Sequence, residues 1–115
     1  MKQFLDNKGN KVELSFSQRA FQEDAKHVLV ICQLQDEWLL TNHKQRGLEF
    51  PGGKGESEET LEDAARREVY EETGAILGDL KYMAEYKVSE QNGSFVKAVF
   101  WGIVKSVEET SSYYE

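Results

Sequence analysis

The spacing of apolar and polar residues predicts strands in both halves of the chain. Residues 27–34 (HVLVICQL) form a continuous apolar run, which is typical of a strand covered on both faces. Residues 80–88 alternate instead, which predicts a strand with one apolar face made of Leu80, Tyr82, Ala84, Tyr86 and Val88. Asn92-Gly93 is a strong hairpin signal, and residues 95–104 supply the partner strand.

The first fifty residues predict shorter strands joined by polar segments. A turn at residues 6–10 joins two strands of a hairpin within residues 1–16. The polar residues 17–25 predict a loop. After the apolar run, residues 38–41 predict a returning strand, and residues 42–47 (NHKQRG) predict a basic loop.

Signals at both ends predict a helix from about Leu61 to Thr73. Thr60 and Asp63 have the spacing of a capping box at the helix start. Gly74 is the usual left-handed residue after a helix end. On a wheel of about 100° per residue, one apolar stripe contains Leu61, Ala64, Ala65 and Val69.

Three glutamates near the end of this helix are unfavourable as a group. Glu68 and Glu72 continue the apolar stripe, and Glu71 lies beside them. Like charges at these spacings repel by roughly 0.2–0.5 kcal/mol per pair, and they also crowd the negative end of the helix dipole. A divalent cation offsets these costs, and carboxylates that leave room for water and phosphate oxygens suit Mg²⁺ or Mn²⁺. From these residues alone, a solvated acidic helix face is the alternative.

Composition and charge narrow the class of protein. At 115 residues the chain suits one domain with a modest core. Its net charge of −7 predicts no binding of duplex nucleic acid by nonspecific charge. Cys32 is the single cysteine, so we expect a buried thiol and a reducing, cytoplasmic environment. We find neither a signal peptide nor an apolar run of about 18 residues, so no membrane association is expected.

A fixed spacing of charged residues and glycines spans the helix and the loop before it. The pattern is G-x5-E-x7-R-E-U-x-E-E-x-G-U, where U is a bulky apolar residue, and its members are Gly53, Glu59, Arg67, Glu68, Glu71, Glu72 and Gly74. On these residues the sequence resembles the Nudix hydrolases. Residues 48–54 (LEFPGGK) resemble the MutT branch, the nucleoside triphosphate pyrophosphohydrolases, and residues 26–43 and 80–88 are similar to the YtkD-type proteins of that branch. Ala75 departs from the pattern because it is small.

The resemblance implies an α/β fold, the Nudix α/β/α sandwich with a mixed β-sheet. It implies one Nudix domain over residues 1–115, with the Nudix box at residues 53–75. The family normally has a further strand and a second large helix, which this sequence lacks. A truncated sequence, a shorter variant and a layer supplied by another chain all stay open. A sheet face left uncovered would favour a homodimer.

The resemblance also implies the metal site and its support. Glu68, Glu71 and Glu72 would hold Mg²⁺ or Mn²⁺ together with the backbone carbonyl of Gly52. Arg67 and Glu59 would form an ion pair that fixes the loop against the helix.

The general base has several candidates. Glu71 or Glu72 is the default, and relatives in the MutT branch can use a carboxylate from a later loop. Glu90 and Glu115 are the candidates for that role, and Glu115 is also a candidate metal ligand.

Phosphates beyond the metal need cations. Lys54 comes from the box itself, whereas Lys44 and Arg46 are candidates by position alone. We expect His43 to be a surface residue and His27 to be less promising still. A purine would stack on an aromatic side chain, and the sequence does not sort the candidates Tyr82, Tyr86, Phe95, Phe100 and Trp101.

Two classes of function follow. The first is an enzyme that hydrolyses a (deoxy)nucleoside triphosphate, with 8-oxo-dGTP as one candidate, to the monophosphate and pyrophosphate. Within this class, RNA with a 5′-triphosphate and ADP-ribose or other nucleoside diphosphate derivatives are alternative substrates. The second class is a noncatalytic Nudix module that senses a nucleotide.

Overall fold

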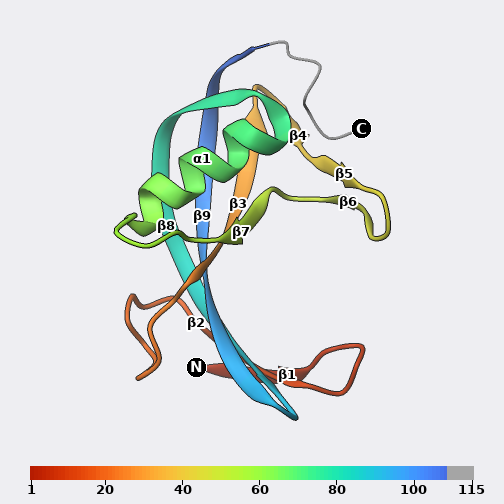
Figure 1. Ribbon diagram of the computed structural model, residues 1–115, viewed down its shortest axis with the longest axis vertical. Helices are drawn as coiled ribbons and strands as arrows, with labels where there is room; N and C mark the ends of the chain where they lie inside the picture. The colour runs from red at the N-terminus through yellow and green to blue at the C-terminus, as the bar shows by residue number, and fades with distance from the viewer. Residues whose placement is uncertain (109–115) are drawn as a thin grey trace.

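The computed structural model describes residues 1–108, which form nine strands and one helix (Figure 1). In chain order these are β1 (Lys2–Leu5), β2 (Lys11–Ser15), β3 (His27–Leu34), β4 (Glu37–Leu39), β5 (Thr41–His43), β6 (Gly47–Glu49), β7 (Gly52–Lys54), α1 (Leu61–Thr73), β8 (Ala75–Glu90) and β9 (Gly93–Val107). In this part of the chain no helix is long and apolar enough to cross a membrane.

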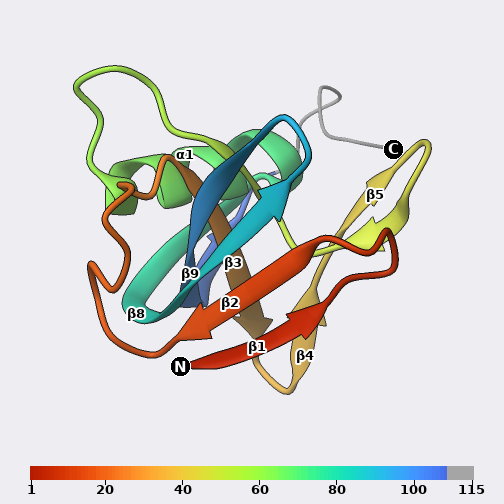
Figure 2. The ribbon, with the colours of Figure 1, turned by 90° about the horizontal axis from the view of Figure 1, so that it is seen from below.

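Seven of the strands form one mixed sheet. The strand order is β1-β2-β8-β9-β3-β4, and β7 pairs with β3 beside this path. β3 runs parallel to β9, whereas the other described pairs are antiparallel. Figures 1 and 2 show α1 across one face of the sheet, with the long β8–β9 hairpin twisting past it. The predicted mixed sheet with a helix packed on it is confirmed.

Helix α1 begins and ends where its sequence signals predict. The Thr60 side chain accepts a hydrogen bond from the Asp63 amide at 3.0 Å, and Gly74 has a φ of 77°. The predicted apolar stripe faces the sheet, and Ala64, Ala65 and Val69 are fully buried against it. Because two of these residues are alanines, the helix can approach the sheet closely and bring the rest of the stripe with it.

Strand β3 is covered less evenly than its apolar run predicts. Val28, Val30 and Cys32 are fully buried on the α1 side, while the residues between them are half-buried. The prediction of a strand covered on both faces is therefore wrong, whereas the buried position of Cys32 is confirmed. Burial raises the pKa of the Cys32 thiol to about 12, so this thiol is unreactive near neutral pH.

Strand β8 does not keep its alternating residues on one face. Tyr82 pairs with Phe100 and the next pair begins at Ala84, so Met83 is an extra residue in a β-bulge. Side chains exchange faces across such an insertion. Tyr82 therefore packs on the α1 side of the sheet, whereas Tyr86 lies on the opposite side. The prediction that both share a face is wrong.

The same bulge turns an apparently exposed acid inward. Glu85 is only 4% exposed. Its carboxylate accepts hydrogen bonds from the backbone N–H of Arg19, at 3.0 Å, and from the Tyr82 hydroxyl. This carboxylate thus attaches the segment before β3 to the sheet.

The segment between β3 and β7 is more regular than predicted. The expected strand at residues 38–41 is divided between β4 and β5. The expected loop at residues 42–47 is part of a separate hairpin, in which Thr41 pairs with Glu49 and His43 with Gly47. This hairpin extends from the sheet beside β7 (Figure 1).

The sheet face away from α1 keeps apolar side chains in contact with solvent. Trp101 and Ile103 of β9 are 37% and 41% exposed. A second helix over this face is not present among residues 1–108. Homodimer formation through this face stays a prediction.

Candidate active site

Two glycines of β7 let this strand pass close to β3 and α1. A Cβ at Gly52 would collide with the backbone carbonyl oxygen of Val28, and one at Gly53 would lie 2.5 Å from a carboxylate oxygen of Glu68. Neither glycine has a positive φ among the described residues. The glycines are therefore required for space, because a side chain at either position would block the close approach of β7.

Arg67 connects the helix to the loop that precedes it. Its guanidinium donates to both carboxylate oxygens of Glu59, at 2.7 and 3.0 Å, which confirms the predicted ion pair. It also donates to Glu68 at 2.8 Å and to the backbone carbonyl of Lys54 at 3.3 Å. The hydrogen bonds from Arg67 lower the pKa of Glu59. One side chain thus fixes the loop, β7 and a helix glutamate relative to each other.

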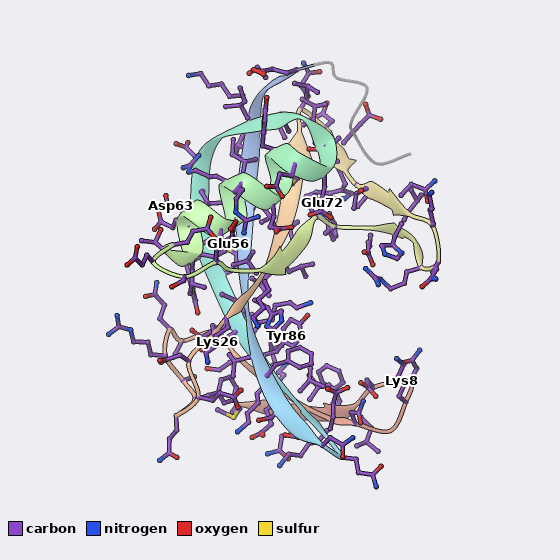
Figure 3. All side chains as sticks on the ribbon, in the orientation of Figure 1. Lys8, Lys26, Glu56, Asp63, Glu72 and Tyr86 are labelled. Carbon is purple, nitrogen blue, oxygen red and sulfur yellow. The ribbon has the colours of Figure 1, made fainter. Side chains whose placement is uncertain are left out.

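Glu68 and Glu72 form a close carboxylate pair at the end of α1 nearest β7. The backbone N–H of Gly52 donates to Glu72 at 3.1 Å. The pKa of Glu72 is raised to about 7, chiefly by burial and also by the neighbouring Glu68, while the hydrogen bond from the Gly52 N–H opposes the change. Two carboxylates sharing a half-buried place attract a proton or a cation. Figure 3 shows Glu72 beside β7.

The third helix glutamate is placed differently. Glu71 has a side chain 57% exposed, and it accepts from Arg67 at 3.3 Å. Across residues 1–108, no three Asp, Glu, His or Cys side chains are gathered tightly enough to form a metal cluster by themselves. The structure brings together two of the predicted ligands, Glu68 and Glu72, and joins Glu71 to them through Arg67.

The predicted phosphate-binding cations lie around β7. Arg46 makes a two-point ion pair with Glu49, at 2.8 and 3.0 Å, and its hydrogen bonds lower the pKa of Glu49. Lys54 is exposed at the end of β7, and Lys44 is exposed in the turn of the β5–β6 hairpin. The His43 ring accepts from the backbone N–H groups of Gln45 and Arg46, which gives it a structural role in that turn.

A cavity of about 590 Å³ lies on the sheet face away from α1. Its floor contains side chains from three neighbouring strands, namely Val12, Leu14, Tyr86, Val88, Phe95 and Lys97. Arg46 and the turn at residues 6–10 form its walls. Figure 3 shows Tyr86 on this side, below β7. Both bases and acids line this cavity, and its apolar floor with Lys97 and Arg46 close by suits a nucleoside that carries phosphates.

The cavity lining shows which aromatic side chains are placed to stack on a purine. Tyr86 and Phe95 line it, whereas Tyr82 and Phe100 pack edge to face in the core with ring centres 5.2 Å apart. The Trp101 indole donates to Gln33 at 3.1 Å outside the cavity. Lys97 and Glu49 are site residues that the sequence did not single out. The strand alternation around Lys97 was visible, but its place in a cavity depends on the distant hairpins.

The structure describes one of the two alternative general bases, Glu90, and not the other, Glu115. Glu90 lines the cavity at the hairpin end of β8, four residues beyond Tyr86. Glu115 lies outside the described residues, so its assignments as base and metal ligand stay predictions.

The mixed, curled sheet, the glycines of β7 and the glutamate-bearing helix define the Nudix class of hydrolases. The NUDIX domain model matches residues 20–112, and the chain belongs to the Nudix family, whose members act on pyrophosphate bonds.

The chain is 45% identical over its full length to YtkD of Bacillus subtilis (strain 168), which carries the provisional name of an 8-oxo-dGTP diphosphatase, and it covers 73% of that protein. It is also similar to a crystal structure of the Bacillus subtilis pyrophosphohydrolase BsRppH, solved as a mutant. There the TM-score is 0.95 and the identity 44%, over 100% of this chain and 73% of the other. A NUDIX hydrolase from Nitrosomonas europaea shares the fold, with a TM-score of 0.66 and 24% identity over 80% and 66% of the two chains.

Nudix hydrolases generally need a divalent metal, usually Mg²⁺. The donor set here fits such an ion, because Glu68 and Glu72 already crowd one half-buried place. Their oxygens are the ligand type that Mg²⁺ prefers. Glu71 is the residue before Glu72 and accepts a hydrogen bond from the Arg67 guanidinium. A metal ion could replace that guanidinium as the partner of Glu71.

Proposed function

We propose that this chain hydrolyses (deoxy)nucleoside triphosphates to the monophosphate and pyrophosphate with Mg²⁺ or Mn²⁺, and that 8-oxo-dGTP is among its substrates. One observation carries the proposal: the Glu68 carboxylate lies against Gly53 of β7, and the cavity adjoins the same strand because its floor residue Lys97 neighbours His27, which neighbours Lys54. A nucleotide with its nucleoside in the cavity can therefore extend its phosphates toward the carboxylates.

The residues divide the chemistry as follows. Glu68, Glu71 and Glu72 would hold the ion, which supplies a Lewis acid for phosphate oxygens and a more acidic attacking water. Arg67 keeps Glu68 oriented through its 2.8 Å bond. Lys54 offsets phosphate charge near the box. The water oxygen would bond to the phosphorus on one side of the α–β phosphoanhydride, the bond from that phosphorus to the bridging oxygen would break to give the monophosphate and pyrophosphate, and a carboxylate would accept the water proton.

The names of the relatives support this choice of substrate. YtkD is provisionally named for 8-oxo-dGTP, and BsRppH is named as a pyrophosphohydrolase. Both names agree with release of pyrophosphate from a triphosphate. For this chain, we expect turnover of dGTP and 8-oxo-dGTP.

A substrate panel tests the proposal. The chain is assayed for pyrophosphate and phosphate release from NTPs, dNTPs, 8-oxo-dGTP, ADP-ribose and 5′-triphosphate RNA, with and without Mg²⁺. Metal-dependent pyrophosphate release from the dNTPs is the expected result. Turnover confined to RNA or to ADP-ribose would reassign the substrate, and absence of turnover would favour a nucleotide-sensing module.

Single substitutions test the machinery. Glu71→Gln should abolish metal-dependent pyrophosphate release with little change in thermal unfolding, because its side chain is mostly exposed. Glu72→Gln should have the same effect on activity. Glu90→Gln is the comparison for the general base. If Glu90→Gln removes activity as completely as the helix substitutions do, the base is assigned to β8 and the helix glutamates to the metal.

A further inference from the structure

Three basic residues form a row across neighbouring strands. Lys54 of β7 stands opposite His27 of β3, and His27 stands opposite Lys97 of β9. Such partners lie about 4.8 Å apart and share a sheet face. Tyr86 continues the row on β8. The row therefore connects the Nudix box with the floor of the cavity.

The row lies on the opposite side of β7 from the helix glutamates. A Cβ added to Gly53 would point at the Glu68 carboxylate, on the α1 side of the strand. Successive residues of a strand point to opposite faces. The next residue, Lys54, therefore points away from α1, and so do His27 and Lys97 beside it.

This row is unfavourable without an anion. Burial lowers the pKa of Lys97, and Arg46 lowers it further while Glu49 opposes the change. Burial also lowers the pKa of His27, with smaller contributions from Lys97 and Lys54. The Nδ1 atom of His27 is buried and, among the described residues, has no hydrogen-bond partner. Glu49 is already paired with Arg46, so it offsets the excess of positive charge only in part.

The position of the row within the site indicates which anion it binds. On one side Lys97 adjoins the aromatic floor, with its ammonium 5.9 Å from the ring centre of Tyr86. On the other side the row ends at Lys54 of the box. A nucleoside over the floor would thus have its first phosphate over Lys97, and the later phosphates beyond it.

We propose that Lys97 binds the phosphate esterified to the nucleoside, and that it is a specificity-determining residue for nucleoside 5′-phosphates. This inference rests on the proposed function because it takes the cavity as the nucleoside site. Lys97 would thereby distinguish nucleotides from inorganic polyphosphates, because a polyphosphate would contact only the Nudix box and leave the aromatic floor of the cavity empty.

Calorimetry without metal tests the inference apart from catalysis. The chain, with chelator present, is titrated with dGMP, with deoxyguanosine and with inorganic pyrophosphate. Lys97→Met should weaken dGMP binding roughly ten- to a hundredfold, the range of a charge-assisted hydrogen bond, and leave deoxyguanosine binding unchanged. Lys97→Arg should retain most of the dGMP affinity. Lys105→Met, at an exposed position of the same strand, is the control.

Several outcomes would overturn it. One is unchanged dGMP binding by Lys97→Met, and another is the absence of dGMP binding by the parent. An equal loss of dGMP and deoxyguanosine would show that Lys97 supports the base or the fold. A loss of pyrophosphate binding without loss of dGMP binding would place Lys97 at the later phosphates.

Kinetics separate this inference from the proposed function. With Mg²⁺ and dGTP, Lys97→Met should raise KM roughly tenfold or more with kcat within a few-fold, as expected for loss of uniform binding. If the parent turns over dGTP and Lys97→Met leaves KM unchanged, the inference fails and the function stands. If dGMP binding depends on Lys97 and no nucleotide is hydrolysed, the function fails and the binding site stands.

Discussion

Gly53→Ala should damage catalysis and spare the fold. The added Cβ would lie 2.5 Å from a carboxylate oxygen of Glu68, whereas ordinary contacts begin near 3.4 Å. The carboxylate must therefore retreat by roughly 0.9 Å. That movement weakens its 2.8 Å bond to Arg67 and separates it from its place beside Glu72. Displacements of about 1 Å at a catalytic group can cost about 10²-fold in rate, or about 2.7 kcal/mol of barrier.

The neighbouring glycines are matched controls. At Gly52 the Cβ would meet the backbone of β3, which cannot rotate aside, so Gly52→Ala should destabilise the protein by about 3 kcal/mol or more. At Gly55 the nearest atoms are the Ala64 Cβ and the Lys26 carbonyl oxygen, both at 3.6 Å, so Gly55→Ala should be nearly neutral. The Gly53 variant should lose less than about 1 kcal/mol, because the displaced group is the end of a flexible side chain.

Two measurements decide the matter. Denaturant unfolding gives the free energy of unfolding of the three variants, and Mg²⁺-dependent pyrophosphate release from dGTP gives kcat/KM. Gly53→Ala should lose activity with little loss of stability, whereas Gly52→Ala should lose the most stability of the three variants. A Gly53→Ala protein with parental kcat/KM would show that the position of Glu68 does not matter for the reaction.

Three further predictions concern other parts of the molecule. Arg67→Met should reduce kcat at least tenfold and Arg67→Lys should not restore it, because a lysine cannot make the two-point bond to Glu59; restoration by lysine would mean that charge alone suffices. The lowered pKa of His27 means that its neutral form is favoured on folding, so its contribution to stability is complete above about pH 6.5 and is lost as pH falls through the folded pKa. Glu72 has the opposite effect, because its protonated form stabilises the fold and is lost as pH rises toward 7. The test therefore compares the free energy of unfolding of the parent and of His27→Gln between pH 5 and 7. If the two free energies change with pH in parallel, the assignment to His27 is contradicted. Sedimentation should show dimers of the parent and monomers of Ile103→Lys; a monomeric parent would show that the exposed face does not self-associate.

The helix and its box were predictable from sequence because their causes are local. Thr60, Asp63 and Gly74 act within one turn of the helix they bound. The pairing of Arg67 with Glu59 was predicted only through the resemblance to the Nudix hydrolases. The buried stripe needed only the helical period and residues whose side chains are small or apolar.

The parts that sequence did not predict depend on distant partners. The bulge at Met83 exists because β9 and β8 pair with unequal numbers of residues, which the alternation within β8 cannot reveal. The outcome for Glu85 follows from that bulge. Lys97 looked like an ordinary polar residue of a strand, and its role depends on β3, β7 and the turn at residues 6–10 assembling around it.

The alternation of β7 explains why this site tolerates strong charges of both signs. Gly53 faces the helix and leaves room for the carboxylates, while Lys54 faces the cavity and joins the basic row. The strand thus separates acids that suit a cation from bases that suit a phosphate, and a metal-bound nucleotide would supply both the cation and the phosphate. A shift of register by one residue would exchange the two faces. It would place a lysine against Glu68 and a glycine beside His27, so the fixed box spacing and the Gly52 contact with β3 protect the chemistry as well as the fold.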